Sequence, residues 1–320
     1  MRVVVTGANG FIGRALCARL GTVGHDVIAV VRRRDDSLTS FGRLAVVPDY
    51  NAPNAWRETL SGNEVVIHLA ARAHRADASD ARTRNEFRRV NVDATRSLTT
   101  QAVAAGIQHI IYMSSIKACA ECSLLDNDKL EIIDQHTAPR PTGPYGESKL
   151  AAERLLAEMC ERSGISLTIF RPPLVYGPGV RGNLATLLNA ILRGLPLPFG
   201  SIKNQRSLIH REHLIDAIML AFTTKLTGTS LFTLSDCVLS TSELVRLMAA
   251  GLRRPAYLIP CPVSVLRMLG KLTRTNAVSR LTESLVVDSD AIRRELGWQP
   301  RVDLASAWAE IGEQYRRDHS

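Results

Sequence analysis

The sequence predicts an α/β protein with a doubly wound parallel sheet and a smaller α/β substrate-binding lobe. Short β-branched runs alternate with helical patterns over the first half of the chain, and a glycine-rich turn joins the first run to the first helix. The alternation then breaks at Arg171-Pro-Pro-Leu-Val-Tyr-Gly-Pro-Gly179. We therefore assign 1–170 and roughly 205–234 to a dinucleotide-binding domain, and 171–204 and 235–320 to the lobe.

Composition narrows the class of protein and its partners. The chain has 320 residues, of which 45% are hydrophobic and 22% charged, and it lacks an apolar run long enough to span a bilayer. The first strand pattern follows Met1 directly, which leaves no room for a signal peptide, so we expect a cytoplasmic protein. A net charge of +9 favours an anionic partner such as a nucleotide diphosphate or a membrane face. The scattered basic residues argue against nucleic acid.

The cysteines indicate reduced thiols rather than a disulfide framework or a metal site. The chain contains six cysteines at irregular spacing. Cys119-Ala-Glu-Cys122 has the C-x-x-C form, but it lacks a second pair and a suitably spaced histidine. We predict no metal site.

The first predicted strand, Val3–Val5, leads into Gly7-Ala-Asn-Gly10-Phe-Ile-Gly13 and then into a helical pattern from Ala15 to Leu20. Glycines in such a turn let the backbone approach a pyrophosphate, which the helix N-terminus attracts. The spacing is G-x-x-G-x-x-G rather than G-x-G-x-x-G, and a tight turn without a ligand is the alternative. Because strand and helix flank the turn as required, we predict a Rossmann-type dinucleotide site.

The second predicted strand, Asp26–Val31, bears on the choice of cofactor. A site for NAD usually ends this strand with an acidic residue that accepts a hydrogen bond from the ribose 2′-hydroxyl. Here Arg32-Arg33-Arg34 follows Val31, and an arginine at this point can pair with a 2′-phosphate. The pattern favours NADP(H), with NAD as the alternative if these arginines form only a charged loop.

The remaining patterns of the first half alternate in the same way. A long helical pattern ends before Gly106. Ser114-Ser115 follows a strand, at the sheet edge where ligands bind in open parallel sheets. The predicted strands are Leu44–Val47, Glu64–Leu69, Gln108–Met113 and Ser166–Phe170, and the long helix is Arg82–Ala105.

Tyr145 and Lys149 mark the start of another predicted helix. Residues at i and i+4 share one helix face, so the ammonium would lie near the phenol. A nearby positive charge favours the phenolate and would lower the pKa of Tyr145. The spacing alone is common in amphipathic helices, so its meaning depends on the upstream motifs.

The lobe is predicted to carry helices near Asn183–Arg193 and Ser242–Arg253. Between Val263 and Leu285 leucines mix with basic residues. Such a stretch can lie on a membrane surface. We favour the alternative, a lobe helix packed over the substrate cleft. The basic residues are Arg267, Lys271, Arg274 and Arg280.

Together these motifs resemble the extended short-chain dehydrogenase/reductase family, in its nucleotide-sugar epimerase/dehydratase branch. The resemblance covers nearly the whole chain and implies a homodimer that pairs the Arg82–Ala105 helix with the Tyr145 helix. Its motifs are Thr6-Gly-Ala-Asn-Gly-Phe-Ile-Gly13, Asp49, His68-Leu-Ala-Ala71, Ser114-Ser115, Tyr145-x-x-x-Lys149, Arg171-Pro172 and Leu296-Gly-Trp-Gln-Pro300.

The resemblance implies roles for individual residues. Tyr145 would be the acid/base on a sugar hydroxyl or ketone, Ser115 would hydrogen-bond the same oxygen, and Lys149 would hold the nicotinamide ribose and lower the pKa of Tyr145. The implied cofactor-binding residues are Gly7, Asn9, Gly10, Phe11, Ile12, Gly13, Arg32, Asp49 (at the adenine amine), Tyr50, Leu69, Ala70, Ala71, Asn91, Ser114, Tyr145, Lys149 and Pro172. The implied substrate-binding residues are Arg206 at the pyrophosphate, with Asn183 and Arg280 beside it. Independently of the resemblance, Arg72, His74 and Lys117 are candidate sugar contacts because they follow predicted strand ends.

Departures from the family pattern bear on the reaction. Sugar 4,6-dehydratases carry an Asp-Glu pair after the catalytic Ser/Thr, where this chain has Ile116 and Lys117, and an isoleucine cannot deliver a proton. Ser-Ser-Ile-Lys and the Arg171–Gly179 segment are similar to bacterial enzymes of O-antigen and lipopolysaccharide synthesis that reduce UDP-4-keto-6-deoxy-N-acetylhexosamines.

Three functions follow from the resemblance. The leading prediction is an NADPH-dependent 4-ketoreductase acting on such a UDP-sugar. The main alternative is a UDP-hexose or UDP-N-acetylhexosamine 4-epimerase with tightly bound NAD. A non-catalytic nucleotide sensor is the third, and the intact set of Ser115, Tyr145 and Lys149 argues against it.

Overall fold

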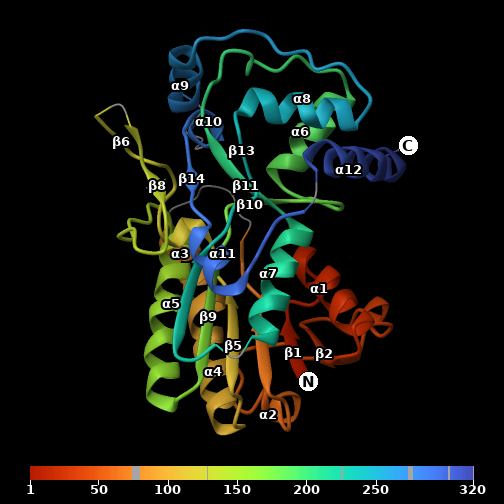
Figure 1. The fold of residues 1–320 in the computed structure, drawn as a ribbon, viewed down its shortest axis with the longest axis vertical. Helices are drawn as coiled ribbons and strands as arrows, with labels where there is room; N and C mark the ends of the chain where they lie inside the picture. The colour runs from red at the N-terminus through yellow and green to blue at the C-terminus, as the bar shows by residue number, and fades with distance from the viewer. Residues whose placement is uncertain (74–79, 128, 225, 273–276, 302, 320) are drawn as a thin grey trace.

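The main sheet in the computed structural model has seven strands, and each neighbouring pair runs parallel (Figure 1). The described residues are 1–73, 80–127, 129–224, 226–272, 277–301 and 303–319. The strand order is β12-β9-β5-β4-β1-β2-β3, so the winding direction reverses between β1 and β4, the point where such sheets bind ligands. The strands are β1 (Arg2–Thr6), β2 (Asp26–Val31), β3 (Arg43–Val46), β4 (Val65–His68), β5 (His109–Met113), β9 (Ser166–Arg171) and β12 (Thr229–Thr233).

The predicted fold class is confirmed: this is a Rossmann-like α/β fold. Six strands match predicted strand patterns to within one or two residues at their ends. The seventh, β12, is an edge strand of sequence Thr-Ser-Leu-Phe-Thr that pairs only with β9. Two apolar residues among three polar ones give little periodicity to recognise.

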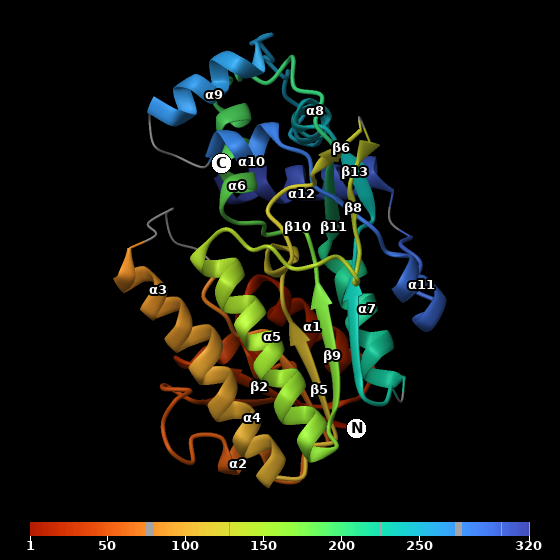
Figure 2. The same cartoon turned by 90° about the vertical axis from the view of Figure 1, so that its left-hand side faces the viewer.

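Helices cover both faces of the sheet. On one face lie α4 (Ala94–Ala104) and α5 (Pro144–Ser163), side by side in Figure 2, and their apolar residues join one buried cluster. On the other lie α1 (Phe11–Thr22), α7 (Arg211–Thr223) and α11 (Asp290–Leu296), which share a second cluster. Both faces of the parallel strands are therefore buried, which accounts for their continuous apolar runs.

The α5 helix has sharply defined ends. Pro144 occupies its first turn, where a missing N–H costs nothing, and Gly164 ends it in the left-handed conformation at φ 69°. These ends fix where the helix begins and therefore which residues face the sheet. Tyr145, Lys149 and Glu153 follow one another at intervals of four residues on one side of it.

The long helix predicted over Arg82–Ala105 is helical throughout, but its middle is wound as a π-helix. The segment forms α3 (Ala81–Phe87), a π-helical segment η2 (Arg88–Asp93) and then α4. Hydrophobic periodicity does not reveal a π segment, because the helical pattern continues on either side of it. Such segments occur frequently at functional sites.

The lobe is built on a three-stranded sheet of β10 (Leu174–Tyr176), β11 (Arg206–His210) and β13 (Cys237–Leu239). Its helices α6 (Asn183–Leu192), α8 (Thr241–Gly251) and α12 (Leu304–His319) enclose their own apolar cluster. Thus β11 belongs to the lobe sheet, whereas β12 belongs to the main sheet and α7 packs on one face of it. The exact division of the chain into two domains stays a prediction.

Short elements complete the described part of the chain, within which no helix is long and apolar enough to cross a membrane. The strand β8 (Ile132–Ile133) pairs in parallel with β14 (Val286–Val287). This pairing joins the segment after Ser115 to the segment that precedes α11. These elements are η1 (Asp36–Leu38), α2 (Arg57–Leu60), η3 (Ile116–Ala118), β6 (Leu125–Asp126), β7 (Lys129–Leu130), β8 (Ile132–Ile133), α9 (Val263–Leu272), α10 (Ala277–Thr282) and β14 (Val286–Val287).

Candidate active site

The glycine turn between β1 and α1 forms a cradle that side chains would fill. Gly7 has φ 67°, and a Cβ on it would lie 2.9 Å from the backbone nitrogen of Ala70. A Cβ on Gly13 would lie 2.3 Å from the carbonyl oxygen of Gly7. Gly10 caps α1 without a side-chain hydrogen bond, so the helix N-terminus keeps its N–H groups for an anion. This arrangement fits a dinucleotide pyrophosphate.

The adenine end of the predicted cofactor site lies beyond β2 and β3. Arg32, Arg33 and Arg34 are exposed directly after β2, and no carboxylate stands at the strand end itself. Tyr50 is buried against Trp56 and its hydroxyl bonds the backbone of Gly7. Burial raises the pKa of Tyr50 to about 12, against the opposing effects of that hydrogen bond and of Arg32. Tyr50 therefore links the end of β3 to the glycine turn.

Tyr145 and Ser115 meet at the C-terminal edge of the sheet. Tyr145 opens α5, Ser115 follows β5, and their side chains are hydrogen-bonded. Burial raises the pKa of Tyr145 to about 12; the bond to Ser115 lowers it and the charge of Glu121 raises it further. The resemblance implied that Lys149 lowers this pKa, but burial dominates in this structure. Tyr145 therefore carries its proton at neutral pH.

Lys149 lies one turn below Tyr145 and is 2% exposed. Its Nζ donates to the backbone oxygen of Met113 at 2.6 Å and to the hydroxyl of Tyr112 at 3.1 Å. Burial lowers the pKa of Lys149 to about 7, and the charge of Glu153 acts in the opposite direction. A small change in surroundings therefore decides whether the amine is charged near neutral pH.

A buried ion pair that the sequence analysis missed supports this lysine. Glu153, one further turn along α5, accepts two hydrogen bonds from Arg171, at 3.0 Å from Nε and 2.6 Å from Nη2. The Ser114 hydroxyl donates to the same carboxylate. Both charged side chains are about 4% exposed, so removal of either would leave a buried charge without its partner. In the sequence, the four-residue spacing of Tyr145, Lys149 and Glu153 is the feature that could have indicated Glu153 as a neighbour of the site.

Asn91 lies in the π-helical segment and joins three elements. Its Oδ1 accepts from the backbone nitrogen of Arg72 at 2.8 Å, and its Nδ2 donates to Ser148 Oγ at 2.9 Å and to the Arg72 oxygen at 3.2 Å. Asn91 is 1% exposed. It therefore fixes the segment after β4 against α5, beside Lys149. The resemblance implies only a cofactor contact for Asn91.

His68 forms the centre of a buried hydrogen-bond chain beneath the site. Burial lowers its pKa to about 3, with a further lowering by Lys149, so the ring is neutral. Thr95 donates to the Asn91 oxygen at 2.7 Å, so it must accept from His68 Nε2 at 3.0 Å. His68 Nδ1 then accepts from Thr6 at 2.7 Å. This series of hydrogen bonds connects β1 to the π-helical segment and requires the His68 tautomer with its proton on Nε2.

Lys117 sits where a dehydratase would have an acidic residue. Its Nζ lies 2.8 Å from Oε2 of Glu121, and its backbone nitrogen donates to Ser115 Oγ at 3.3 Å. The Lys117 carbonyl oxygen would be 2.3 Å from a Cβ on Gly146. The turn that carries Ser115 and Lys117 therefore packs directly on the first turn of α5.

Arg206 and Arg280 are close enough to influence each other. Burial lowers the pKa of Arg206, the carboxylates of Glu283 and Glu121 raise it, and Arg280 lowers it again. Arg206 Nη1 donates to the Glu283 backbone oxygen at 3.1 Å. Two neighbouring guanidinium groups in a partly desolvated setting suit a diphosphate.

The other predicted residues are placed as follows. Arg72 pairs with Glu86 at 2.7 Å and lies over the Phe87 ring, so its guanidinium is committed to α3. Pro172 is buried, and its oxygen accepts from the Ile116 nitrogen at 2.9 Å. His74 lies outside the described residues. Asn9, Asp49, Ala71 and Asn183 are exposed, and Phe11, Ile12, Leu69 and Ala70 are partly buried.

Comparison with known proteins places these features in one family. The model of the NAD dependent epimerase/dehydratase family matches residues 3–231. A UDP-glucose 4-epimerase of Vibrio cholerae is 34% identical over 316 residues, with 98% of this chain and 95% of the relative covered. The N-acetyl-α-D-glucosaminyl-diphospho-ditrans,octacis-undecaprenol 4-epimerase of Escherichia coli O157:H7 is 27% identical, with 82% and 77% covered.

Solved structures agree in fold. MoeE5 in complex with UDP-glucuronic acid and NAD has a TM-score of 0.80 at 28% identity, with 99% of this chain and 100% of that chain covered. The UDP-glucuronic acid 4-epimerase from Bacillus cereus has a TM-score of 0.82 at 19% identity, a likeness of fold alone. The glycine cradle, the Ser115–Tyr145 pair and the family match over residues 3–231 lead to one conclusion: the chain belongs to the NAD dependent epimerase/dehydratase family of enzymes.

Proposed function

We propose that this enzyme reduces the C4 ketone of a UDP-4-keto-6-deoxy-N-acetylhexosamine. The observations that carry this proposal are Tyr145 beside Ser115 at the sheet edge, where the phenol can give a proton to a ketone oxygen, and the exposed arginines after β2, which favour NADP(H) and therefore net reduction. Ile116 and Lys117, in place of two acids, argue against 4,6-dehydration.

In this proposal each residue of the site has a defined task. A nicotinamide cofactor held in this site would supply the hydride for C4. Tyr145 gives its proton to the C4 oxygen, and Ser115 donates a hydrogen bond to the same oxygen as negative charge develops there. Lys149 holds the nicotinamide ribose, and Glu153 with Arg171 keeps the helix turn that carries Lys149 in place. Arg206 and Arg280 would bind the substrate diphosphate.

The cofactor proposed is NADP(H). Arg32, Arg33 and Arg34 are exposed at the end of β2, where a carboxylate would select the 2′-hydroxyl of NAD. Arg32→Ala should raise the KM for NADPH on the order of tenfold and leave that for NADH nearly unchanged. Arg34→Ala is the matched control, because Arg34 already pairs with Asp36 at 2.7 Å. Equal loss with both cofactors would contradict the assignment.

A 4-epimerase is the second candidate, and the 34% identical relative from Vibrio cholerae favours it. In an epimerase Tyr145 would first remove the C4 hydroxyl proton, and bound NAD would be regenerated in each cycle without net reductant. MoeE5, which is 28% identical and was solved with NAD, adds support for the cofactor this candidate needs.

The deciding experiment measures the oxidation of NADPH by its absorbance in the presence of a UDP-4-keto-6-deoxy-N-acetylhexosamine. A parallel assay uses NADH in place of NADPH. We expect NADPH oxidation and a reduced UDP-sugar product, both abolished by Tyr145→Phe. Interconversion of UDP-glucose and UDP-galactose, or of their N-acetyl forms, without added cofactor would replace the reductase by the epimerase. Analysis of the nucleotide released from denatured enzyme gives an independent check, because stoichiometric NAD is expected only of the epimerase.

A further inference from the structure

Two stretches of the chain, which include most of the lobe segments around α6, α8 and α9, contain basic residues but no acidic ones. Neither 162–211 nor 244–282 contains an Asp or a Glu. Each contains seven basic residues, and the net charge of the whole chain is +9. Those of the first stretch are Arg162, Arg171, Arg181, Arg193, Lys203, Arg206 and Arg211, and those of the second are Arg246, Arg253, Arg254, Arg267, Lys271, Arg274 and Arg280.

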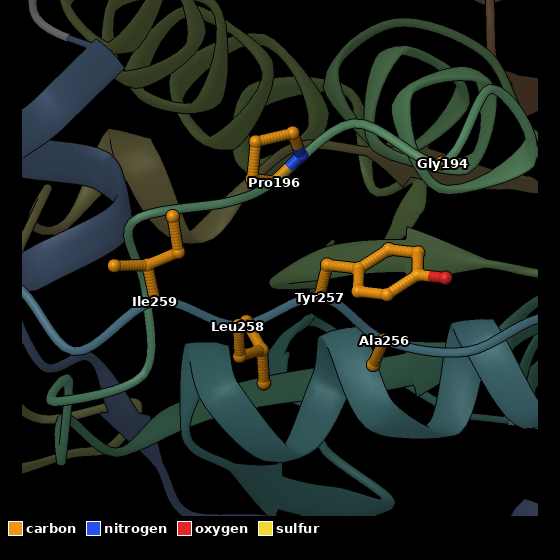
Figure 3. A pocket seen from close by; sticks show the side chains of 6 residues that line it. All are labelled: Gly194, Pro196, Ala256, Tyr257, Leu258 and Ile259. Atoms are coloured by element: carbon orange, nitrogen blue, oxygen red, sulfur yellow. The ribbon is translucent and has the colours of Figure 1, made fainter.

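The two stretches are joined by backbone pairing at the surface of the lobe. Leu197 N donates to the Tyr257 oxygen at 2.8 Å, and Ile259 N donates to the Leu197 oxygen at 2.9 Å. Gly194 and Pro196 on one side and Ala256 to Ile259 on the other line an open, mostly apolar groove (Figure 3). The apolar side chains of this surface are thus held on an ordered backbone.

Large apolar side chains in these two stretches remain exposed to water. Leu195, Tyr257 and Ile259 are 50%, 54% and 50% exposed. On the neighbouring α9, Met268 is 65% and Val265 40% exposed, while Leu266 is buried. Figures 1 and 2 both show α9 at the end of the molecule opposite the main sheet. Clusters of exposed apolar residues on a soluble domain mark interaction surfaces.

Exposed arginines flank the apolar side chains. Arg193 follows α6 and directly precedes Gly194 in the groove. Arg253 and Arg254 follow α8 and precede the groove segment that begins at Ala256. All three arginines are exposed. We define the lobe tip by its apolar residues Leu195, Pro196, Tyr257, Ile259, Val265 and Met268 and by Arg193, Arg253 and Arg254. Apolar and aromatic side chains edged by cations, without carboxylates in the same stretches, complement anionic lipid headgroups over an acyl boundary.

We propose that the lobe tip docks on the surface of an anionic lipid bilayer. A protein partner with an acidic face would fit the arginines, but exposed Leu, Ile, Val and Met side chains at the end of the molecule suit insertion into the interface of a membrane. The groove is lined by residues of the segments that follow α6 and α8, so docking leaves the sheet edge with Tyr145 unchanged. The proposal is independent of the sugar and of the direction of hydride transfer.

The test is flotation of the full chain with lipid vesicles in a density gradient. Vesicles with about 30% phosphatidylglycerol in phosphatidylcholine should carry the protein, and vesicles of phosphatidylcholine alone should carry much less. Addition of NaCl to about 0.5 M should weaken the binding, because the Debye length then falls well below 10 Å. Equal recovery with both vesicle types, or no flotation with either, would overturn the proposal.

Variants then separate the lobe tip from general basicity. Arg253→Glu with Arg254→Glu should lower the binding constant by at least about tenfold, and Tyr257→Ser with Ile259→Ser by a similar factor. The matched control is Arg57→Glu with Arg294→Glu, two exposed arginines outside the lobe tip, which should lose much less. Equal loss in the control would show nonspecific charge attraction and overturn the proposal.

Two further measurements keep the test decisive. Met268→Ser changes one side chain that is 65% exposed, so it should fold normally and still reduce flotation several-fold. Sedimentation of each variant tests whether the lobe tip instead binds a second copy of the chain. Loss of a dimer in the Tyr257/Ile259 variant with unchanged flotation would assign the surface to self-association and overturn membrane docking. Reductase or epimerase activity on a water-soluble substrate should not change in any of them.

Discussion

The two ends of the candidate active site differ in how their charges are satisfied. At the sheet edge Lys149, Glu153 and Arg171 are almost fully buried and hydrogen-bonded within the protein, with Ser114 and Tyr112 in the same network. At the lobe end Arg206 has a neighbouring cation, Arg280, and its pKa is lowered by burial. The first end is held together by its own side chains, whereas at the second Arg206 lies near Arg280 as well as near the carboxylates of Glu283 and Glu121, and a bound anion would add a further favourable interaction.

The difference teaches that catalysis and recognition should respond separately to mutation. Changes at the sheet edge should affect turnover or folding, because the groups there are held by one another. Changes at the lobe end should affect substrate affinity, because the cationic pair contributes most when it is neutralised by bound phosphate.

The largest expected effect is that of Tyr145→Phe. Loss of the proton donor should lower kcat on the order of a hundredfold or more, with little change in the KM for the nucleotide-sugar. Steady-state kinetics measures both constants, and the thermal unfolding midpoint serves as the control for folding. Near-normal turnover would remove Tyr145 from the proposed role.

Arg206→Met should show the opposite pattern. Removal of one guanidinium from the pair should raise the dissociation constant for UDP by roughly tenfold to a hundredfold, while kcat at saturating substrate changes little. Calorimetric titration with UDP measures this directly. Arg181→Met, at an exposed arginine of the same acid-free stretch, is the matched control. A drop in kcat without loss of UDP affinity would break the distinction between the two ends.

A smaller effect is expected from Gly146→Ala. The added Cβ would meet the Lys117 carbonyl oxygen at 2.3 Å, so the turn that carries Ser115 must move away from α5. We expect a loss of about 1–3 kcal/mol in the free energy of unfolding and a lower kcat. Gly143→Ala is the control, because its nearest neighbour is the Glu121 side chain at 3.9 Å. Similar denaturation curves for the two variants would show that this packing is not tight.

The pH dependence of stability tests the buried amine. The pKa of Lys149 is about 7 in the folded protein and 10.5 as its reference value, so between these values the unfolded chain binds more protons. Stability should therefore rise with pH in this window, by at most about 1.4 kcal/mol per pH unit from this group. Lys149→Met should flatten that rise in urea unfolding between about pH 7 and 9. An unchanged slope would mean that Lys149 is charged in the folded state.

Much of the main sheet could be predicted because its strands are buried on both faces and appear as continuous apolar runs. The glycine turn and the Tyr145–Lys149 pair were also recognisable, because local backbone geometry and helix spacing determine them. The π-helical segment was not, because Asn91 bonds to the Arg72 backbone and to Ser148, two partners far away in the sequence. The same reason hid the Glu153–Arg171 pair and the role of Glu121 near Tyr145.

The pKa of Tyr145 shows a further limit of sequence reasoning. The i, i+4 spacing correctly places Lys149 one turn along the same helix, and a nearby cation alone would lower the pKa of the phenol. Spacing does not reveal how far each group is removed from water, and burial is the largest cause of the shift in the pKa of both Tyr145 and Lys149. The sign of a pKa shift therefore depends on packing that only the folded chain supplies.

The π-helical segment Arg88–Asp93 also limits how far the number of residues in it can change, by evolution or by engineering. Deletion of one residue from Arg88–Asp93 would let the wide π-helical turn close into regular α-helical turns, so the side chains of this segment would no longer point where they do now. Asn91 would then lose its alignment with both the β4 segment and α5. Insertions and deletions that surface loops accept should be rare here, so the number of residues between Arg88 and Thr95 is a signature by which chains with the same internal support can be recognised.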